Sequence, residues 1–206
     1  MTLRHAIRSL LLVLGVAALA SCGINSVPRA EENAKAKWAD VQAAFQERAN
    51  LVPNLAEVAQ GAAEQERGIL TDVIEARAKA TSVQVSANDL NDPAKMAEFQ
   101  AAQSQLSAGL GRLLASFEAY PDLKSIANYQ MLQSQLEGQE NRIRIAIRDY
   151  NEAVRQYNTT IRTFPDTIGA NIIHGAEPMV PYEATTPGAE AAPQLDMTPN
   201  SDTQAN

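Results

Sequence analysis

The fold is decided by residues 128–164, NYQMLQSQLEGQENRIRIAIRDYNEAVRQYNTTIRTF. Large apolar side chains recur along this stretch at intervals of three, four or seven residues, which places them on one face of an α-helix. They are Tyr129, Leu132, Leu136, Ile143, Ile147, Tyr150, Val154, Tyr157, Ile161 and Phe164. The pattern predicts one long amphipathic helix from about Ile126 to Thr163, whose apolar face must be buried against other elements.

Residues 92–120 carry a second face with the same spacing, which runs through Met96, Phe99, Gln103, Leu106, Leu110, Leu113, Phe117 and Tyr120. Asp92 is a suitable N-cap residue, and Pro93 suits the first helical position. Gly109 and Gly111 lie beside this face, where the missing side chains would let a neighbouring helix approach closely. The stretch therefore predicts a second long helix with a close helical neighbour.

Five prolines bracket four stretches of the chain, and proline usually begins or ends a helix because it has no N–H to donate. They are Pro28, Pro53, Pro93, Pro121 and Pro165. We predict helices over residues 29–49 and 50–80, with Pro53 in the first turn of the second. The competing interpretation is one long helix kinked at Pro53, since the apolar spacing nearly continues through it. A turn is favoured because it makes the four segments comparable in length.

Four amphipathic helices with short connections predict an all-α protein, an antiparallel up-and-down four-helix bundle with long helices over residues 29–165. Residues 166–206 contain five further prolines and almost no apolar periodicity. A segment of this composition buries too little apolar surface to offset its ordering entropy. Residues 166–206 are therefore predicted to be a flexible, Pro-rich C-terminal tail.

The first residues are typical of an export signal. Arg4 and Arg8 precede an apolar run from Ser9 to Ala20, and this run is shorter than the roughly 20 residues of a membrane-spanning helix. Its end matches a bacterial lipobox, in which the signal is cut before a lipidated cysteine: Leu19, Ala20, Ser21 and Cys22. Residues 1–21 are predicted to be a signal peptide, and residues 22–28 the lipidated Cys22 and a short linker. The alternative is an uncleaved N-terminal membrane anchor.

Composition excludes several classes of function. The chain has a formal net charge of −7, whereas a nucleic-acid-binding face must be basic. One cysteine and two histidines, His5 and His174, leave little for disulfides, multi-cysteine metal sites or a di-iron centre. Catalysis by Ser, His and Asp would depend on His174, which lies at the start of the predicted tail of residues 166–206. We therefore expect no catalytic residues, no metal, no cofactor and no nucleic-acid partner.

A stripe of polar residues follows the helix of residues 126–163. It is either a solvated face laced by ion pairs or a face on which a partner docks. The candidate partner face consists of Glu137, Glu140, Asn141, Arg144, Arg148, Asn151, Arg155 and Asn158.

The predicted turn near Pro53 is a second candidate. Leu51, Val52 and Pro53 would either pack beneath the turn, which is the favoured choice, or form an exposed apolar tip that grips a partner. The candidate turn motif consists of Arg48, Leu51, Val52, Pro53, Asn54 and Leu55.

Seven short strings resemble the LemA family, and the resemblance extends over about residues 22–165. They are RANLVPNL at 48–55, EARAKA at 75–80, LGRLLA at 110–115, EAYPDLK at 118–124, LEGQENRI at 136–143 and the YN pairs at 150 and 157. The resemblance implies a membrane-attached, up-and-down helical bundle that faces outside the cytoplasm and has no established enzyme activity. Relatives in this family occur beside TPM-domain envelope proteins and membrane metallopeptidases, so the resemblance implies a partner of one of these kinds. One branch of the family functions in magnetosome membranes.

These observations predict a membrane-anchored, exported helical bundle that is a non-catalytic interaction or scaffold protein of the cell envelope. Its expected place is the cell membrane or the outer membrane, held through lipidated Cys22 and facing the periplasm. One alternative is a membrane-shaping or lipid-binding protein, although the net negative charge of the chain disfavours binding to anionic lipids. A second alternative is an envelope hydrolase that depends on carboxylates alone.

Overall fold

The computed structural model describes the backbone of residues 2–59, 67–117 and 127–183, and the side chains of residues 5, 25–57, 68–116 and 129–183. Every regular element in these ranges is helical, which confirms the all-α prediction. The elements are α1 (Thr2–Ala59), α2 (Arg67–Ser82), α3 (Pro93–Phe117), α5 (Ala127–Thr160), α6 (Asp166–Gly169) and the π-helical turn η2 (Ala170–His174).

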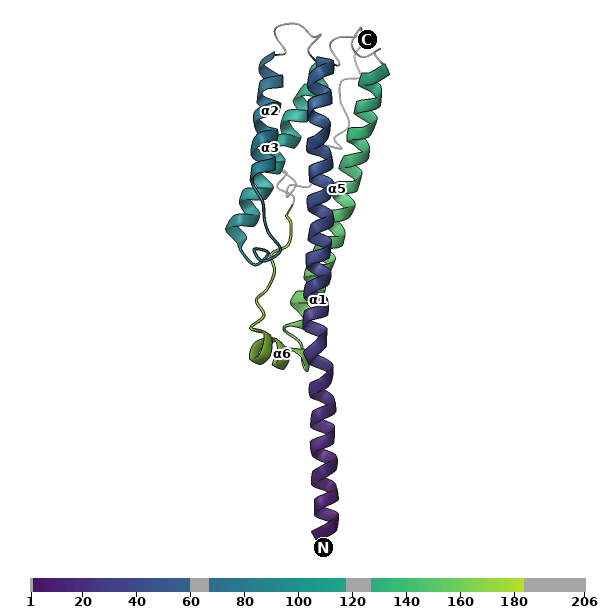
Figure 1. Ribbon diagram of the computed structural model, residues 1–206, viewed down its shortest axis with the longest axis vertical. Helices are drawn as coiled ribbons and strands as arrows, with labels where there is room; N and C mark the ends of the chain where they lie inside the picture. Colours follow the sequence, from purple (N-terminus) through teal and green to yellow (C-terminus); the bar gives the residue numbers. More distant parts are fainter. Residues whose placement is uncertain (1, 60–66, 118–126, 184–206) are drawn as a thin grey trace, which may run out of the picture.

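The helices pack mainly as two pairs, α1 with α5 and α2 with α3, and α1 also contacts α2 (Figure 1). In the view of Figure 1, α1 rises and α5 descends beside it, while α3 rises next to the descending α2. These pairings are compatible with the predicted four-helix arrangement. The N-terminal part of α1 continues beyond the other helices.

The predicted turn near Pro53 is wrong, because α1 runs without interruption through both Pro28 and Pro53. The competing interpretation of one long helix is the one that the structure supports. Pro53 has no N–H for the carbonyl of Ala49, four residues earlier. Arg77 of α2 supplies the missing donor, since its Nε lies 2.8 Å from that carbonyl oxygen. A side chain from the neighbouring helix thus satisfies the group that the proline leaves free.

Aromatic rings dominate the core cluster between α1 and α5. Trp38 is 1% exposed, and its ring centroid lies 5.3 Å from that of Phe99 and 5.1 Å from that of Tyr150. The indole N–H donates to the carbonyl of Val85 at 2.8 Å, so the connection after α2 is tied to α1. Trp38 of α1 therefore packs against α3 through Phe99 and against α5 through Tyr150.

A second core cluster lies nearer the α1–α2 connection and contains mostly Leu and Val from the four long helices. Here α2 and α3 approach closely: a Cβ built on Gly109 would lie 3.3 Å from Cγ2 of Val73. The predicted close approach is confirmed at Gly109. At Gly111 an added Cβ meets nothing within 4 Å, so that glycine is not required by packing.

The predicted boundary at residue 165 is wrong, because residues 166–183 are fixed against the bundle. Ala170, Met179 and Tyr182 are buried in the first core cluster. The segment from Ala176 to Glu183 is extended, and side chains of α5 bind its backbone groups in place of secondary structure. Few apolar residues suffice here because these hydrogen bonds also hold the chain. Residues 184–206 lie outside the described residues.

The predicted signal peptide and lipobox fall on α1, whose backbone is helical from Thr2. The side chains of Leu19, Ala20, Ser21 and Cys22 lie outside the described residues. In the described part of the chain, no helix is both long enough and apolar enough to span a bilayer.

Candidate functional site

Arg48 of α1 is almost completely buried, with 1% of the residue exposed. Its Nη1 donates to Oε1 of Glu140 at 2.9 Å and to the hydroxyl of Ser107. Its Nη2 donates to Oε1 of Gln103 at 3.0 Å and to the backbone oxygen of the same residue at 3.2 Å. One guanidinium therefore connects α1 with both α3 and α5, and Glu140 compensates its charge.

The guanidinium also lies over the ring of Phe45, with Cζ 5.0 Å from the ring centroid. Its Nε is buried and finds no hydrogen-bond partner among the residues that the structure describes. An arginine suits this place because its planar group presents several donors in fixed directions and stays charged when buried.

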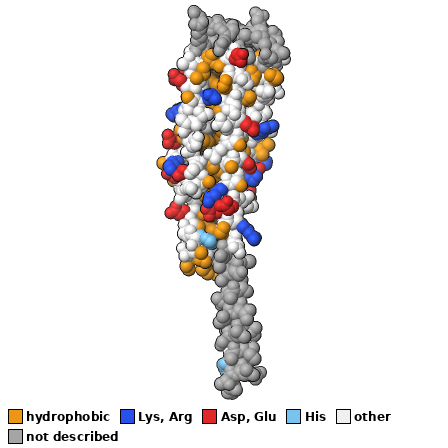
Figure 2. Space-filling view, in the orientation of Figure 1, with side chains coloured by type: hydrophobic (Ala, Val, Ile, Leu, Met, Phe, Trp, Pro, Cys, Tyr) orange, Lys and Arg blue, Asp and Glu red, His pale blue; other side chains and the backbone are white. Residues whose placement is uncertain are grey.

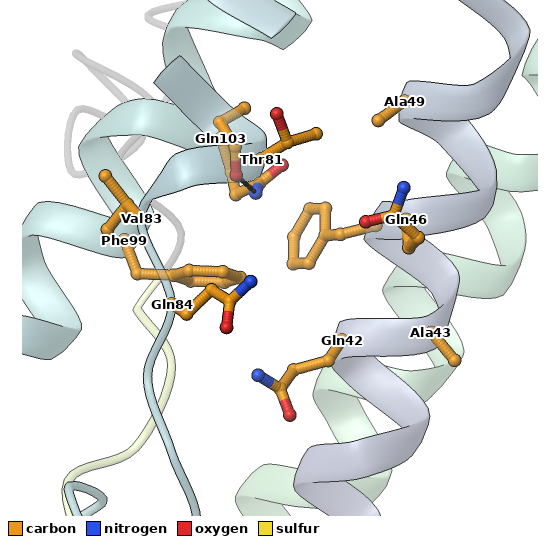
Figure 3. A pocket seen from close by; sticks show the side chains of 11 residues that line it. Gln42, Ala43, Gln46, Ala49, Thr81, Val83, Gln84, Phe99 and Gln103 are labelled. Carbon is orange, nitrogen blue, oxygen red and sulfur yellow. Dashed lines mark hydrogen bonds between the residues drawn. The ribbon is translucent and has the colours of Figure 1, made fainter. Parts of the chain in front are cut away.

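A groove of about 300 Å³ opens beside this arginine, between α1 and the α2–α3 pair (Figure 3). Phe45 and Phe99 line it and meet edge to face, with ring centroids 5.5 Å apart. Four glutamines also line it: Gln42 and Gln46 from α1, Gln84 from the connection after α2, and Gln103 from α3. The remaining lining residues are Ala43, Ala49, Ala80, Thr81 and Val83.

Three of the glutamine side chains are held by their own hydrogen bonds. The amide of Gln42 donates to the carbonyl of Val85 at 3.1 Å, and that of Gln103 donates to the carbonyl of Ala80 at 3.0 Å. Gln46 donates to Oδ1 of Asn50 at 2.9 Å. None of the described residues that line the groove is ionisable, so the groove suits hydrogen bonding and apolar contact with an uncharged ligand.

The candidate partner face on α5 is divided by the structure, because two of its members bind the chain itself. Asn158 donates to the carbonyl of Met179 at 2.8 Å and accepts from the N–H of Met179 at 2.9 Å. Asn151 binds both backbone groups of Tyr182 in the same way, each at 2.8 Å. These two asparagines are half-buried by the extended segment and are not available to a partner.

The tyrosine before each asparagine extends this arrangement. Tyr150 donates to the carbonyl of Val180 at 2.8 Å, and Tyr157 donates to that of Glu177 at 3.0 Å. The two tyrosine–asparagine pairs are seven residues apart, about 10.5 Å along a helix. Three residues of extended chain span about 10 Å, which is the offset between the backbone groups that the two pairs bind. We call Tyr150, Asn151, Tyr157 and Asn158 the clamp.

Burial raises the pKa of each phenol that contacts this segment. The pKa of Tyr182 is raised to about 12 by burial, which outweighs the opposite influence of Arg48. Burial also raises the pKa of Tyr150 and of Tyr157 above the usual value. These three phenols are therefore neutral at physiological pH, and Tyr150 and Tyr157 can donate their hydrogen bonds.

The side chains of the other six members of the candidate partner face are exposed to solvent on α5. Glu140 binds Arg48, while Arg144 donates to Asn141 at 3.2 Å. Arg148 lies 3.0 Å from Asp149, and Arg155 pairs with Glu152. Glu137 is exposed as well and accepts from Gln133 at 3.3 Å.

The candidate turn motif is a stretch of helix, so its interpretation as a turn is wrong. Val52 and Leu55 are buried in the second core cluster, and Leu51 packs against it. Pro53 and Asn54 are exposed. The favoured choice, packing against the bundle, therefore holds for Leu51 and Val52, whereas Pro53 is exposed.

Sequence reasoning missed both the groove and the clamp. A glutamine at a seam position, Gln103, and the tyrosine–asparagine pair repeated after seven residues were the available signals. Neither indicates by itself which backbone groups will lie opposite, because those come from segments distant in the sequence.

A sequence model described as the LemA family matches residues 37–197, a range that contains the groove and the clamp. The comparison with curated proteins gave no match. The family match spans most of the chain, so this protein belongs to the LemA family.

Proposed function

We propose that this protein is a membrane-anchored, exported helical bundle that acts as a non-catalytic interaction or scaffold protein of the cell envelope. The observation that carries the proposal is the groove beside Arg48, which is open and lined by glutamines and two phenyl rings. In this proposal the four long helices form an up-and-down bundle, and the groove on its side receives a segment of a partner protein.

The chemistry of the groove fits an uncharged stretch of polypeptide. Carboxamide groups pair with peptide N–H and C=O groups, and the rings of Phe45 and Phe99 offer apolar contact. The clamp supports this choice, because the same bundle already holds an extended segment through asparagine amides. The family resemblance indicates a TPM-domain protein or a membrane metallopeptidase as the partner.

The proposed anchor is Cys22, lipidated after the signal is cut. Several acyl chains on one residue give stable attachment, whereas one chain alone binds a membrane only marginally. The bundle would then face the periplasm from the cell membrane or the outer membrane.

Site-specific crosslinking in living cells tests the groove. A photo-crosslinking amino acid replaces Gln46 or Gln84, and Gln156 on the exposed side of α5 is the matched control. We expect one envelope protein to be crosslinked from both groove positions and not from the control. Crosslinks of equal yield from all three positions, or none from the groove, would contradict the proposal. The same experiment on a chain that ends at residue 183 identifies any crosslink to the chain's own last residues.

Intact-mass measurement tests the anchor independently. The mature protein from membranes should have the mass of residues 22–206 plus acyl chains, and Cys22→Ala should abolish this processing. A mass equal to the whole chain would show an uncleaved anchor instead.

A further inference from the structure

Large apolar side chains gather at one end of the bundle. Four of the seven exposed large hydrophobic residues in the described part of the chain fall within ten positions of each other. They are Phe164 at 72% exposed, Ile168 at 52%, Ile172 at 79% and Ile173 at 56%. We call these four residues the apolar end. The other three, Ile74, Met131 and Ile145, come from separate places on α2 and α5.

The apolar end is held in a fixed conformation with its large side chains outward. The N–H of Thr167 donates to the carbonyl of Thr163 at 2.8 Å, and that of Ala176 donates to the carbonyl of Ala170 at 3.0 Å. Ala170 is fully buried and turns its small side chain toward the core. The helical turns therefore bury alanine and leave isoleucine in the open, an arrangement typical of a surface that something covers.

This end is also the one from which α1 leaves the bundle toward the N-terminus (Figure 1). Ser26 of α1 donates to Oδ1 of Asp166 in α6 at 2.5 Å, and Val27 is fully buried beside it. Figure 2 shows apolar side chains gathered on the bundle at this end. Cys22 precedes Ser26 by four residues, about 6 Å of helix. Any membrane attachment through Cys22, or through the apolar run before it, thus places the bilayer against the apolar end.

We propose that the apolar end lies in the interfacial layer of the membrane that carries the N-terminal anchor. This inference rests on the membrane attachment in the proposed function, and holds for a lipidated Cys22 and for an uncleaved anchor. Interfacial segments of this kind bury their apolar face about 5–10 Å into the boundary between headgroups and acyl chains. The exposed Arg29 and Arg162 are close in sequence to Ser26 and Phe164 and would meet lipid phosphates.

Two attachment points fix the orientation of the bundle, whereas one flexible anchor would not. On α1 the groove runs from Gln42 to Ala49, which are 16 and 23 residues after Ser26, so it lies about 24–35 Å further along the helix. A partner of the groove would therefore meet the bundle at about this distance along α1 from the apolar end.

Fluorescence quenching by lipids tests the inference in proteoliposomes of the full mature chain. Ile172→Cys is labelled with an environment-sensitive dye. The chain's one native cysteine, Cys22, is blocked when lipidated, and it is replaced by alanine if the intact mass shows an uncleaved anchor. Met131→Cys is the matched control, because this residue is 53% exposed and lies at the start of α5, the opposite end of the bundle. Vesicle flotation and intact mass establish the anchor in both variants.

We expect the dye at residue 172 to be quenched by nitroxides on the lipid acyl chains, and the dye at residue 131 to be quenched only by aqueous iodide. Quenching of residue 172 by iodide alone, with flotation and acyl mass intact, would overturn the inference and leave the proposed function standing. Protection from both quenchers would show that a second copy or residues 184–206 cover the apolar end, which also overturns it. Loss of flotation in the unlabelled chain would overturn the anchor and the inference together.

Discussion

At the scale of the residue, Arg48 places a positive charge where only 1% of the residue reaches solvent. Such a charge is tolerated when hydrogen bonds and an opposite charge replace its hydration. Glu140 and Ser107 provide this for Nη1, and Gln103 provides two acceptors for Nη2. The carboxylate of Glu140 is 49% exposed, so it can be solvated again if the arginine is lost.

The first prediction is that Arg48→Met lowers the free energy of unfolding by about 1–3 kcal/mol, because the buried acceptors of Gln103 lose their donor. Arg48→Lys should also destabilise, since one ammonium group cannot replace a planar group with several donors. Urea unfolding followed by circular dichroism measures both. The control is Arg142→Met, whose exposed pair with Glu47 at 3.2 Å should contribute less than about 1 kcal/mol. Equal losses in the two methionine variants would contradict the role given to Arg48.

At the scale of the element, α1 continues through a proline that would ordinarily end or kink a helix. An internal proline removes one helical hydrogen bond and crowds the carbonyl four residues earlier, at a cost of about 3 kcal/mol. In this helix the freed carbonyl of Ala49 accepts from Arg77 of α2. Pro53 itself is exposed, and its neighbours Val52 and Leu55 are buried. Tertiary contacts therefore keep the helix intact where local sequence favours a break.

The second prediction is an energetic coupling between Pro53 and Arg77. Arg77→Leu should destabilise the chain by about 1 kcal/mol when residue 53 is proline, because the Ala49 carbonyl then loses its donor. In the background of Pro53→Ala the same substitution should cost less, since the alanine N–H restores the helical bond. A double-mutant cycle from urea unfolding measures the difference, expected at about 0.5–1 kcal/mol. Additive effects of the two substitutions would show that the hydrogen bond is not the reason for their pairing.

At the scale of the whole molecule, residues 176–183 complete the bundle by closing the first core cluster. Met179 and Tyr182 fill it, and the Tyr182 ring lies 5.8 Å from that of Phe45. The clamp binds the backbone of this segment through two neutral phenols. Burial favours the neutral form of each phenol in the folded state, so folding and protonation are linked.

The third prediction concerns alkaline pH. An unperturbed tyrosine has a pKa of about 10, whereas that of Tyr182 is about 12 in the folded chain. The stabilisation is fully present below about pH 10 and is lost as the pH rises toward 12, because only the unfolded chain can release these protons easily. We expect release of residues 176–183 in this range, with a change in the fluorescence of Trp38, which lies against Tyr150.

Absorbance of tyrosinate and fluorescence of Trp38, the only tryptophan, are the two readouts. The double variant Tyr150→Phe and Tyr157→Phe removes two of the titrating phenols, so its stability should fall less between pH 10 and 12. The double variant should also be less stable at neutral pH, because the hydrogen bonds from the two tyrosine hydroxyls to residues 176–183 are lost. Titration of all tyrosines near pH 10 without any change at Trp38 would contradict this linkage.

Periodicity in the sequence predicted the existence and type of the long helices, since burial of one face requires the spacing of three and four. The glycine beside the second apolar face indicated the close approach that the structure shows at Gly109. The resemblance to the LemA family came from the matching strings of residues and not from periodicity.

The use of proline as a helix boundary failed at Pro53, where the apolar spacing itself nearly continues, and the use of composition failed at residue 165. Proline does disfavour a continuous helix, but the hydrogen bond from Arg77 to Ala49 compensates for it at Pro53. A polar segment does tend to stay unfolded, but the asparagines of α5 bind the backbone of residues 179 and 182.

The sequence by itself determined an all-helical chain and the faces that its long helices bury, and the lipidated N-terminus stays a prediction. Only the tertiary structure decided that α1 continues through Pro53 and that Arg48 is buried where α1 contacts α3 and α5. It also decided that Asn151 and Asn158 of the candidate partner face bind the backbone of residues 176–183. Periodic burial is a local property that repeats along the chain. A hydrogen bond between Arg77 and Ala49, or between Asn158 and Met179, exists only once the helices are packed.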